Sequence, residues 1–194
     1  QGGMNLRKAG EDFYFLQKLF PLPGFCELNS TRVVPSPRVS HRVPFGTGKV
    51  ISEYIDQSKD NLTTYSPRGF EDLQKLLYCI PALHQEQDPL FTLEKLPLTI
   101  RNYLQQRNIA DELARIKSNS SDFTSFKKQF FAWFGGLKVL QFFHYARQNH
   151  ADIPIVQAAQ WLLHELNIPV SKDWEAKELL LKYREMDRKW NYKL

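Results

Sequence analysis

The chain has 194 residues, of which 42% are hydrophobic and 24% are charged. This length and balance are typical of one folded domain, or of one domain with an appendage, and they exclude an intrinsically disordered chain. The net charge of +5 is spread along the sequence, which argues against a dedicated nucleic-acid binder, and no apolar run is long enough to span a membrane. The two cysteines, Cys26 and Cys79, stand among apolar residues and indicate buried thiols, so we expect a cytoplasmic, reducing location.

The first predicted element is a helix over residues 11–20. It opens with Glu11 and Asp12, continues through the aromatic and aliphatic residues 13–16, and is expected to stop at Pro21. Carboxylates are favoured in the first turn of a helix, where the macrodipole is positive and backbone amides lack partners. A cap with no further role is one interpretation of this acidic pair, and it remains open.

The next segment is extended and basic. Runs 25–28 and 31–34 are rich in aromatic and β-branched residues and predict a short β pair. No acidic residue occurs from Leu28 to Ser52, whereas the basic residues Arg32, Arg38, His41, Arg42 and Lys49 all fall there. Arginines that bind phosphate in a bidentate way, together with glycines that let backbone amides approach, form a plausible diphosphate cradle. A solvated loop whose bases pair with carboxylates elsewhere is the open alternative.

Everything after a polar linker at 56–64 is predicted to be helical. Lys49 to Ile55 predicts a short helix before the linker, and Ser66-Pro67 is a strong start signal for a helix ending at Pro81. We expect further helices capped by Thr92, running from Ile109 to Ile116, starting near 152–154, and capped by Ser171. The longest apolar periodicity, 121–143, predicts one buried central helix with a crossing or a kink at Gly135-Gly136. The fold class is therefore mainly α.

The motif Gly10-Glu11-Asp12, its aromatic helix and the later Pro44-Phe45-Gly46-Thr47-Gly48 together resemble the acceptor-side end of a family 2 glycosyltransferase domain, of the inverting GT-A type. The resemblance covers about the first fifty to sixty residues. It implies an α/β domain of which one helix and a short β pair are present here. It also implies that Asp12 is the general base for the acceptor hydroxyl and that Glu11 orients the acceptor.

The same resemblance assigns roles in the basic loop. Arg38, Arg42 and Lys49, with Gly46, Thr47 and Gly48, would bind the diphosphate of a nucleotide-sugar donor, and His41 would be a metal ligand or a diphosphate contact. A plain loop histidine is the alternative for His41. The family's cofactor is a divalent cation, Mn²⁺ or Mg²⁺, in the intact enzyme. The Asp-x-Asp motif that usually holds it is absent from this sequence, and so is the Gln-x-x-Arg-Trp signature of processive members.

We therefore expect two domains. Residues 1–60 would be the C-terminal part of a glycosyltransferase catalytic domain, cut from a longer protein and inactive alone, and 61–194 a helical, bundle-like domain of unknown role. The partners expected for the parent protein are a nucleotide-sugar donor and a glycan or another hydroxyl acceptor, with no nucleic acid. The alternative from a different class is a non-enzymatic helical protein-interaction domain, which exposed aromatic residues around 123–143 would favour.

Overall fold

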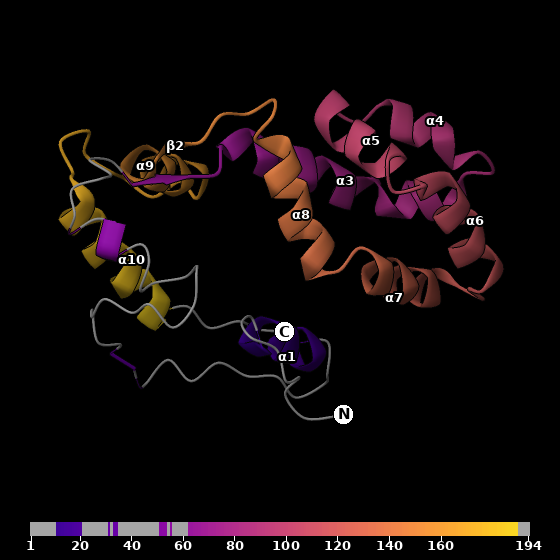
Figure 1. Cartoon of the computed structure of the whole chain (residues 1–194), viewed down its shortest axis with the longest axis horizontal. Helices are drawn as coiled ribbons and strands as arrows, with labels where there is room; N and C mark the ends of the chain where they lie inside the picture. Colours follow the sequence, from indigo (N-terminus) through magenta and orange to yellow (C-terminus); the bar gives the residue numbers. More distant parts are fainter. Residues whose placement is uncertain are drawn as a thin grey trace. The chain divides into compact units, whose positions relative to one another are not determined.

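The computed structural model describes residues 11–20, 31, 33–34, 51–53, 55 and 62–189, and the protein is mainly α-helical, as predicted (Figure 1). The chain divides into two compact units, residues 63–153 (unit 2) and residues 1–62 with 154–194 (unit 1). The expected division into domains 1–60 and 61–194 stays a prediction, because compact units and evolutionary domains are different things.

Unit 2 is built around helix α3. The helices of this unit are α3 (Pro67–Gln85), α4 (Pro89–Glu94), α5 (Leu98–Gln105), α6 (Ile109–Ser118), α7 (Phe123–Trp133) and α8 (Gly136–Ala146). Figure 1 shows α4 and α5 on one side of α3 and α7 on the other, and α3 packs against all three. In addition, α8 packs on α5, and α6 packs on α4, α5 and α7.

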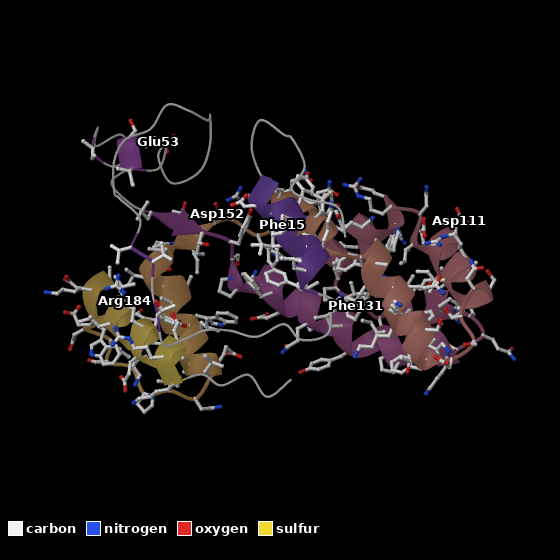
Figure 2. All side chains as sticks on the ribbon, turned by 90° about the horizontal axis from the view of Figure 1, so that it is seen from below. Phe15, Glu53, Asp111, Phe131, Asp152 and Arg184 are labelled. Atoms are coloured by element: carbon white, nitrogen blue, oxygen red, sulfur yellow. The ribbon has the colours of Figure 1, made fainter. Side chains whose placement is uncertain are left out.

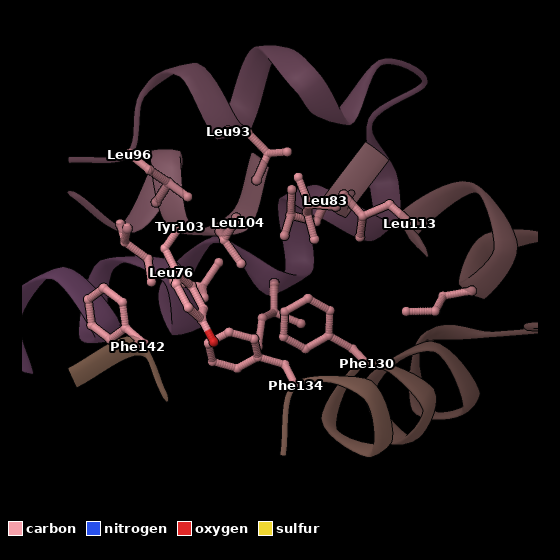
Figure 3. Close-up of a cluster of buried hydrophobic side chains, with 14 of the residues drawn as sticks. Leu76, Leu83, Leu93, Leu96, Tyr103, Leu104, Leu113, Phe130, Phe134 and Phe142 are labelled. Carbon is pink, nitrogen blue, oxygen red and sulfur yellow. The ribbon is translucent and has the colours of Figure 1, made fainter. Parts of the chain in front are cut away.

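The interior of unit 2 is a single apolar cluster to which every one of these helices contributes (Figure 3). Leu76, Leu104, Leu113 and Phe130 are fully excluded from solvent. The Tyr103 hydroxyl, which is also buried, donates to the Lys138 carbonyl at 2.8 Å, so its polar atom is satisfied inside the cluster. Burial raises the pKa of this tyrosine. A buried cluster of this extent supplies the main driving force for folding of the unit.

Three helix boundaries in unit 2 differ from the sequence expectation. Ser66 does cap α3, its Oγ accepting the Arg68 amide at 3.4 Å, but the helix continues past Pro81 to Gln85. Pro81 has no amide to donate to the Leu77 carbonyl, but both residues are exposed, so the unpaired carbonyl lies on the solvent side of the helix. The helix expected from Thr92 is instead two helices. Asp88 caps α4, Thr92 lies inside it, and α5 begins only after Pro97.

The predicted central helix at 121–143 is also two helices. Phe134 leaves the helical conformation with ψ 58° and Gly135 is extended, so α7 ends at Trp133 and α8 starts at Gly136. Paired glycines favour such a break because each costs a helix interior about 1 kcal/mol relative to alanine. The periodicity misleads because Phe134 is itself buried and continues the apolar spacing across the break.

Unit 1 contains α1 (Glu11–Leu19), α9 (Ile155–Glu165) and α10 (Ala176–Lys189). Helix α1 confirms the predicted helix before Pro21. Residues 51–53 and 55 are helical, as expected, whereas Thr31, Val33 and Val34 lie in no strand; the rest of the expected β pair falls outside the described residues. Helix α10 starts later than predicted, because Ser171 accepts the Asp173 amide within a turn rather than capping the helix.

Helices α9 and α10 pack on each other as a hairpin. Leu163 and Leu179 are buried, and the Tyr183 hydroxyl donates to the Ala159 carbonyl at 2.7 Å. Two short strands, β1 (Thr63–Thr64) and β2 (Ile153–Pro154), form a two-stranded antiparallel sheet. Just outside them, the Ile155 amide donates to the Leu62 carbonyl at 2.9 Å.

Candidate functional site

The first turn of α1 holds the acidic pair that the sequence singles out. Glu11 begins the helix and Asp12 follows it, with an exposed side chain whose Oδ1 accepts the Phe13 amide at 2.8 Å. This contact uses one of the amides that a helix start leaves without a helical partner. The carboxylate therefore has the cap-like environment expected for it, and it is open to solvent, from which a substrate hydroxyl could approach.

The aromatic side of α1 gives that turn its support. Phe13 and Tyr14 are partly buried and their rings meet edge to face, with centroids 5.5 Å apart. Phe15, labelled in Figure 2, is also partly buried, whereas Leu16 and Phe20 are more than 40% exposed. The exposed positions Asp12, Leu16 and Phe20 recur every four residues, so the solvent-facing side of α1 carries two large apolar side chains as well as the carboxylate.

Apart from Glu11 and Asp12, the expected site falls outside the part of the chain that the structure describes. Arg38, His41, Arg42, Gly46, Thr47, Gly48 and Lys49 all lie outside the described residues. Their assignment to donor binding stays a prediction. Within the residues that are described, no group of three or more His, Cys, Asp or Glu side chains is arranged to hold a metal ion.

A buried His–Asp pair lies in unit 2, and no motif in the sequence indicates it. Asp72, on α3, and His150, just after α8, are separated by 78 positions, yet His150 Nε2 lies 3.1 Å from Asp72 Oδ2. Their side chains are only 9% and 15% exposed. The second ring nitrogen, Nδ1, is buried without a hydrogen-bond partner. In the neutral ring, donation from Nε2 to the carboxylate leaves Nδ1 as a bare acceptor.

A second polar cluster joins the beginning and the end of unit 2. The Tyr65 hydroxyl lies 3.4 Å from His144 Nε2, and the Arg147 guanidinium stacks on the Tyr65 ring at 4.4 Å. Arg147 Nε donates to Asp152 at 2.9 Å, and this bond raises the pKa of Arg147. With His144 exposed and Arg147 committed to Asp152, the cluster ties chain segments together and contains no free nucleophile.

A pocket of about 280 Å³ opens between α4, α5 and α6. Leu93 and Ile109 form part of its apolar lining, and the charged residues Glu94, Arg101 and Asp111 line it as well. Arg101 already donates to the Glu94 carbonyl at 2.9 Å. Because two carboxylates and one guanidinium share this small space, its charge matches no single class of ligand.

The free thiol of Cys79 is partly buried, and burial raises its pKa, which makes it a poor nucleophile at neutral pH. No helix in the described part of the chain is long and apolar enough to cross a membrane. Comparison with protein-family models, with curated proteins and with solved structures gives no match for this chain.

Proposed function

We propose that residues 1–60 form the acceptor side of an inverting, family 2-like glycosyltransferase domain, which transfers a sugar from a nucleotide-sugar donor to an acceptor hydroxyl. The observation that carries the proposal is the Glu11–Asp12 pair in the first turn of α1, with the Asp12 carboxylate exposed. A general base must reach the proton it abstracts, and an exposed carboxylate at a helix start meets that requirement.

The proposed reaction assigns one proton transfer to Asp12. Its carboxylate accepts the proton of the acceptor hydroxyl while the acceptor oxygen bonds to the anomeric carbon of the donor. The bond from that carbon to the diphosphate breaks, and the electron pair leaves with the diphosphate. Attack from the face opposite the leaving group inverts the configuration. Glu11 orients the acceptor in this scheme.

The proposed donor side uses the basic loop. Arg38, Arg42 and Lys49, with backbone amides at 46–48, would stabilise the negative charge that develops on the departing diphosphate. A divalent cation, Mn²⁺ or Mg²⁺, belongs to the proposal for the intact parent enzyme, with His41 as its ligand or as a diphosphate contact. When bound, such a cation neutralises leaving-group charge. No described residue is assigned to it.

We also place the protein in the cytoplasm. The support is the cysteine usage: the chain has two cysteines, and Cys79 is a free, partly buried thiol with a raised pKa.

The test is an Asp12→Asn substitution in the intact parent protein, assayed for hexose transfer from a panel of nucleotide sugars. Asparagine keeps the oxygen that accepts the Phe13 amide and removes the basic carboxylate, so kcat should fall at least about a hundredfold with little change in KM. Asp122→Asn is the matched control. Asp122 also accepts an amide at a helix start, from Ser125 at 2.8 Å, but it lies at the start of α7. A transfer rate near that of the wild type for Asp12→Asn would refute the assignment of Asp12 as the general base.

A second candidate is a non-enzymatic helical interaction domain, and exposed aromatic residues favour it. Phe123 and Phe131 on α7 and Tyr78 on α3 are 39%, 40% and 75% exposed. Large apolar side chains left in solvent mark contact surfaces in many proteins. A Phe131→Ser substitution that abolishes self-association or capture of a defined partner, in a protein without transferase activity, would establish this candidate in place of the first.

A further inference from the structure

Helix α10 has two opposite faces of different character. The inward face packs against α9 through Leu179, which is 2% exposed, and Tyr183, which bonds to the Ala159 carbonyl. The outward face is a line of residues spaced four, three and four positions apart, namely Lys177, Leu181, Arg184 and Arg188. Such spacing keeps side chains on one side of a helix, over about 17 Å of its axis. All four are exposed.

The cations of this outward face are available to an external partner. Lys177, Arg184 and Arg188 take part in none of the ion pairs that α10 forms within the described residues. The charged pairs of α10 lie elsewhere on the helix, where Glu185 is bound by Lys182 at 3.4 Å and by Lys189 at 2.5 Å. These lysines hold the pKa of Glu185 below its ordinary range. Figure 2 shows charged side chains projecting from α10 around Arg184.

The remaining acidic residues of α10 do not neutralise the positive charge of the outward face. The Glu178 carboxylate accepts the Glu175 amide at 3.2 Å and is directed to the start of the helix. Asp187 lies about a quarter turn from the line of cations, on the same flank as Leu180 and two turns further along the helix. The line therefore carries three cations and no carboxylate, and none of these cations forms an ion pair within the described residues.

Two exposed leucines decide which kind of anionic partner fits. Leu181, in the line of cations, is 55% exposed, and the adjacent Leu180 is 50% exposed. A nucleic-acid backbone binds cations, and aliphatic side chains between those cations make no favourable contact with it. A lipid surface binds both the cations and the leucines, because cations contact anionic headgroups while leucines enter the boundary between headgroups and acyl chains.

We propose that the outward face of α10 docks on an anionic lipid surface, with Lys177, Arg184 and Arg188 on the headgroups and Leu180 and Leu181 at the acyl boundary. The cytoplasmic leaflet carries anionic lipids, and each cation near it strengthens binding about fivefold. Three cations and two leucines on one helix give a weak and reversible attachment that is screened by salt. The proposal is independent of sugar transfer.

Vesicle flotation of the whole chain tests this proposal. The probes are vesicles of phosphatidylcholine alone and vesicles in which about a third of the lipid is phosphatidylserine. We expect binding to the second kind only, and loss of binding as salt is raised well above about 0.1 M. The triple charge reversal Lys177→Glu, Arg184→Glu and Arg188→Glu should weaken binding at least about a hundredfold, since all three attractions are removed.

Two further variants distinguish a lipid-docking face from a simple effect of net charge. Lys75→Glu, Lys127→Glu and Lys128→Glu change the net charge equally at exposed positions on α3 and α7, and this variant should still bind. Leu180→Ser with Leu181→Ser keeps every charge and should weaken vesicle binding several-fold. All the variants alter exposed side chains, and unchanged circular dichroism would establish that they fold.

Several results would overturn the proposal. One is a wild-type chain that does not bind the anionic vesicles at low salt, and another is an α10 reversal that leaves binding intact. Equal losses in the α10 and the α3–α7 reversals would mean that only overall charge matters. Unchanged vesicle binding of the leucine variant, together with equally tight binding of a DNA duplex, would make the face a general polyanion site.

Discussion

Unit 2 and the α9–α10 hairpin are both helical, yet they bury side chains to different extents. In residues 63–153 every helix contributes buried residues to one continuous apolar cluster, with Phe130 and Phe142 among the largest. In the hairpin, only Leu163 and Leu179 are buried among the described hydrophobic residues. Because stability follows buried apolar area, unit 2 should resist unfolding on its own, whereas the hairpin depends on a few contacts. The hairpin in turn presents more of its leucines to the outside.

The largest expected effect is the loss of a core ring in unit 2. Phe130 has no exposed surface, and its ring contacts those of Phe126, Trp133 and Phe134. Phe130→Ala should lower the free energy of unfolding by about 3–5 kcal/mol, as removing a buried aromatic ring does. Urea denaturation followed by far-ultraviolet circular dichroism measures this loss. A loss below about 1 kcal/mol would contradict the continuous cluster, since it is the size expected for a surface change.

A smaller effect is expected from the corresponding truncation of a buried side chain in the α9–α10 hairpin. Leu163→Ala removes the buried side chain of α9 and should cost about 2–4 kcal/mol, less than Phe130→Ala because leucine loses fewer buried atoms than phenylalanine. Hydrogen exchange should show faster exchange in α9 and α10 and no change in α3–α8. Leu162→Ala, at a 40% exposed position of the same helix, is the control. Acceleration throughout unit 2 would mean that the two regions unfold together.

The buried polar pair of unit 2 comes next. His150→Ala leaves the Asp72 carboxylate, whose side chain is 9% exposed, without its partner, and should lower the free energy of unfolding by about 1–2 kcal/mol. The exposed His164 provides the matched control, because its side chain is 84% accessible and His164→Ala should change little. Equal losses in the two variants, measured by thermal unfolding, would show that the Asp72–His150 contact contributes nothing.

The smallest effect is a pH-dependent one at the start of α7. The hydrogen bond from the Ser125 amide lowers the pKa of Asp122. Because the folded-state pKa lies below the unfolded value of about 3.9, the stabilisation is complete above that pH and is lost as the pH falls through the folded value. Asp122→Ala should therefore lower the unfolding temperature at neutral pH, and the difference from wild type should vanish in acid. A difference that persists in strong acid would assign the effect to another group.

Local signals in the sequence predict much of this fold. Ser66-Pro67 marks the start of α3, and the acidic pair before an aromatic run marks α1 and places Asp12 in its first turn. These features depend on neighbouring residues, which a sequence displays directly. The sequence indicates a crossing or a kink at Gly135-Gly136, but it does not predict that one helix ends and another begins there, because apolar spacing continues across the break. The passage of α3 through Pro81 is not predicted because that proline is exposed to solvent.

The polar contacts of unit 2 are beyond prediction for a different reason. Asp72 and His150 are distant in sequence, and neither belongs to a motif. Only the packing of α3 with the segment after α8 brings them together. Donor binding by the loop from Arg38 to Lys49 remains a hypothesis. The transfer assay with Asp12→Asn tests the acceptor side of the same proposed site.

The hydrogen bond between Leu62 and Ile155 bears on the order in which the chain folds. It joins residues on either side of unit 2, so about ninety residues lie in the loop that it closes. Closing so long a loop in a disordered chain carries a large entropic cost, but a folded unit 2 already holds its two ends together through β1 and β2. We expect Leu62 and Ile155 to pair only after unit 2 has formed. In a shortened chain, a two-residue turn would replace 63–153, and Leu62 and Ile155 should then pair without unit 2 having to fold first. Segments whose two ends lie close together can often be inserted or removed in this way.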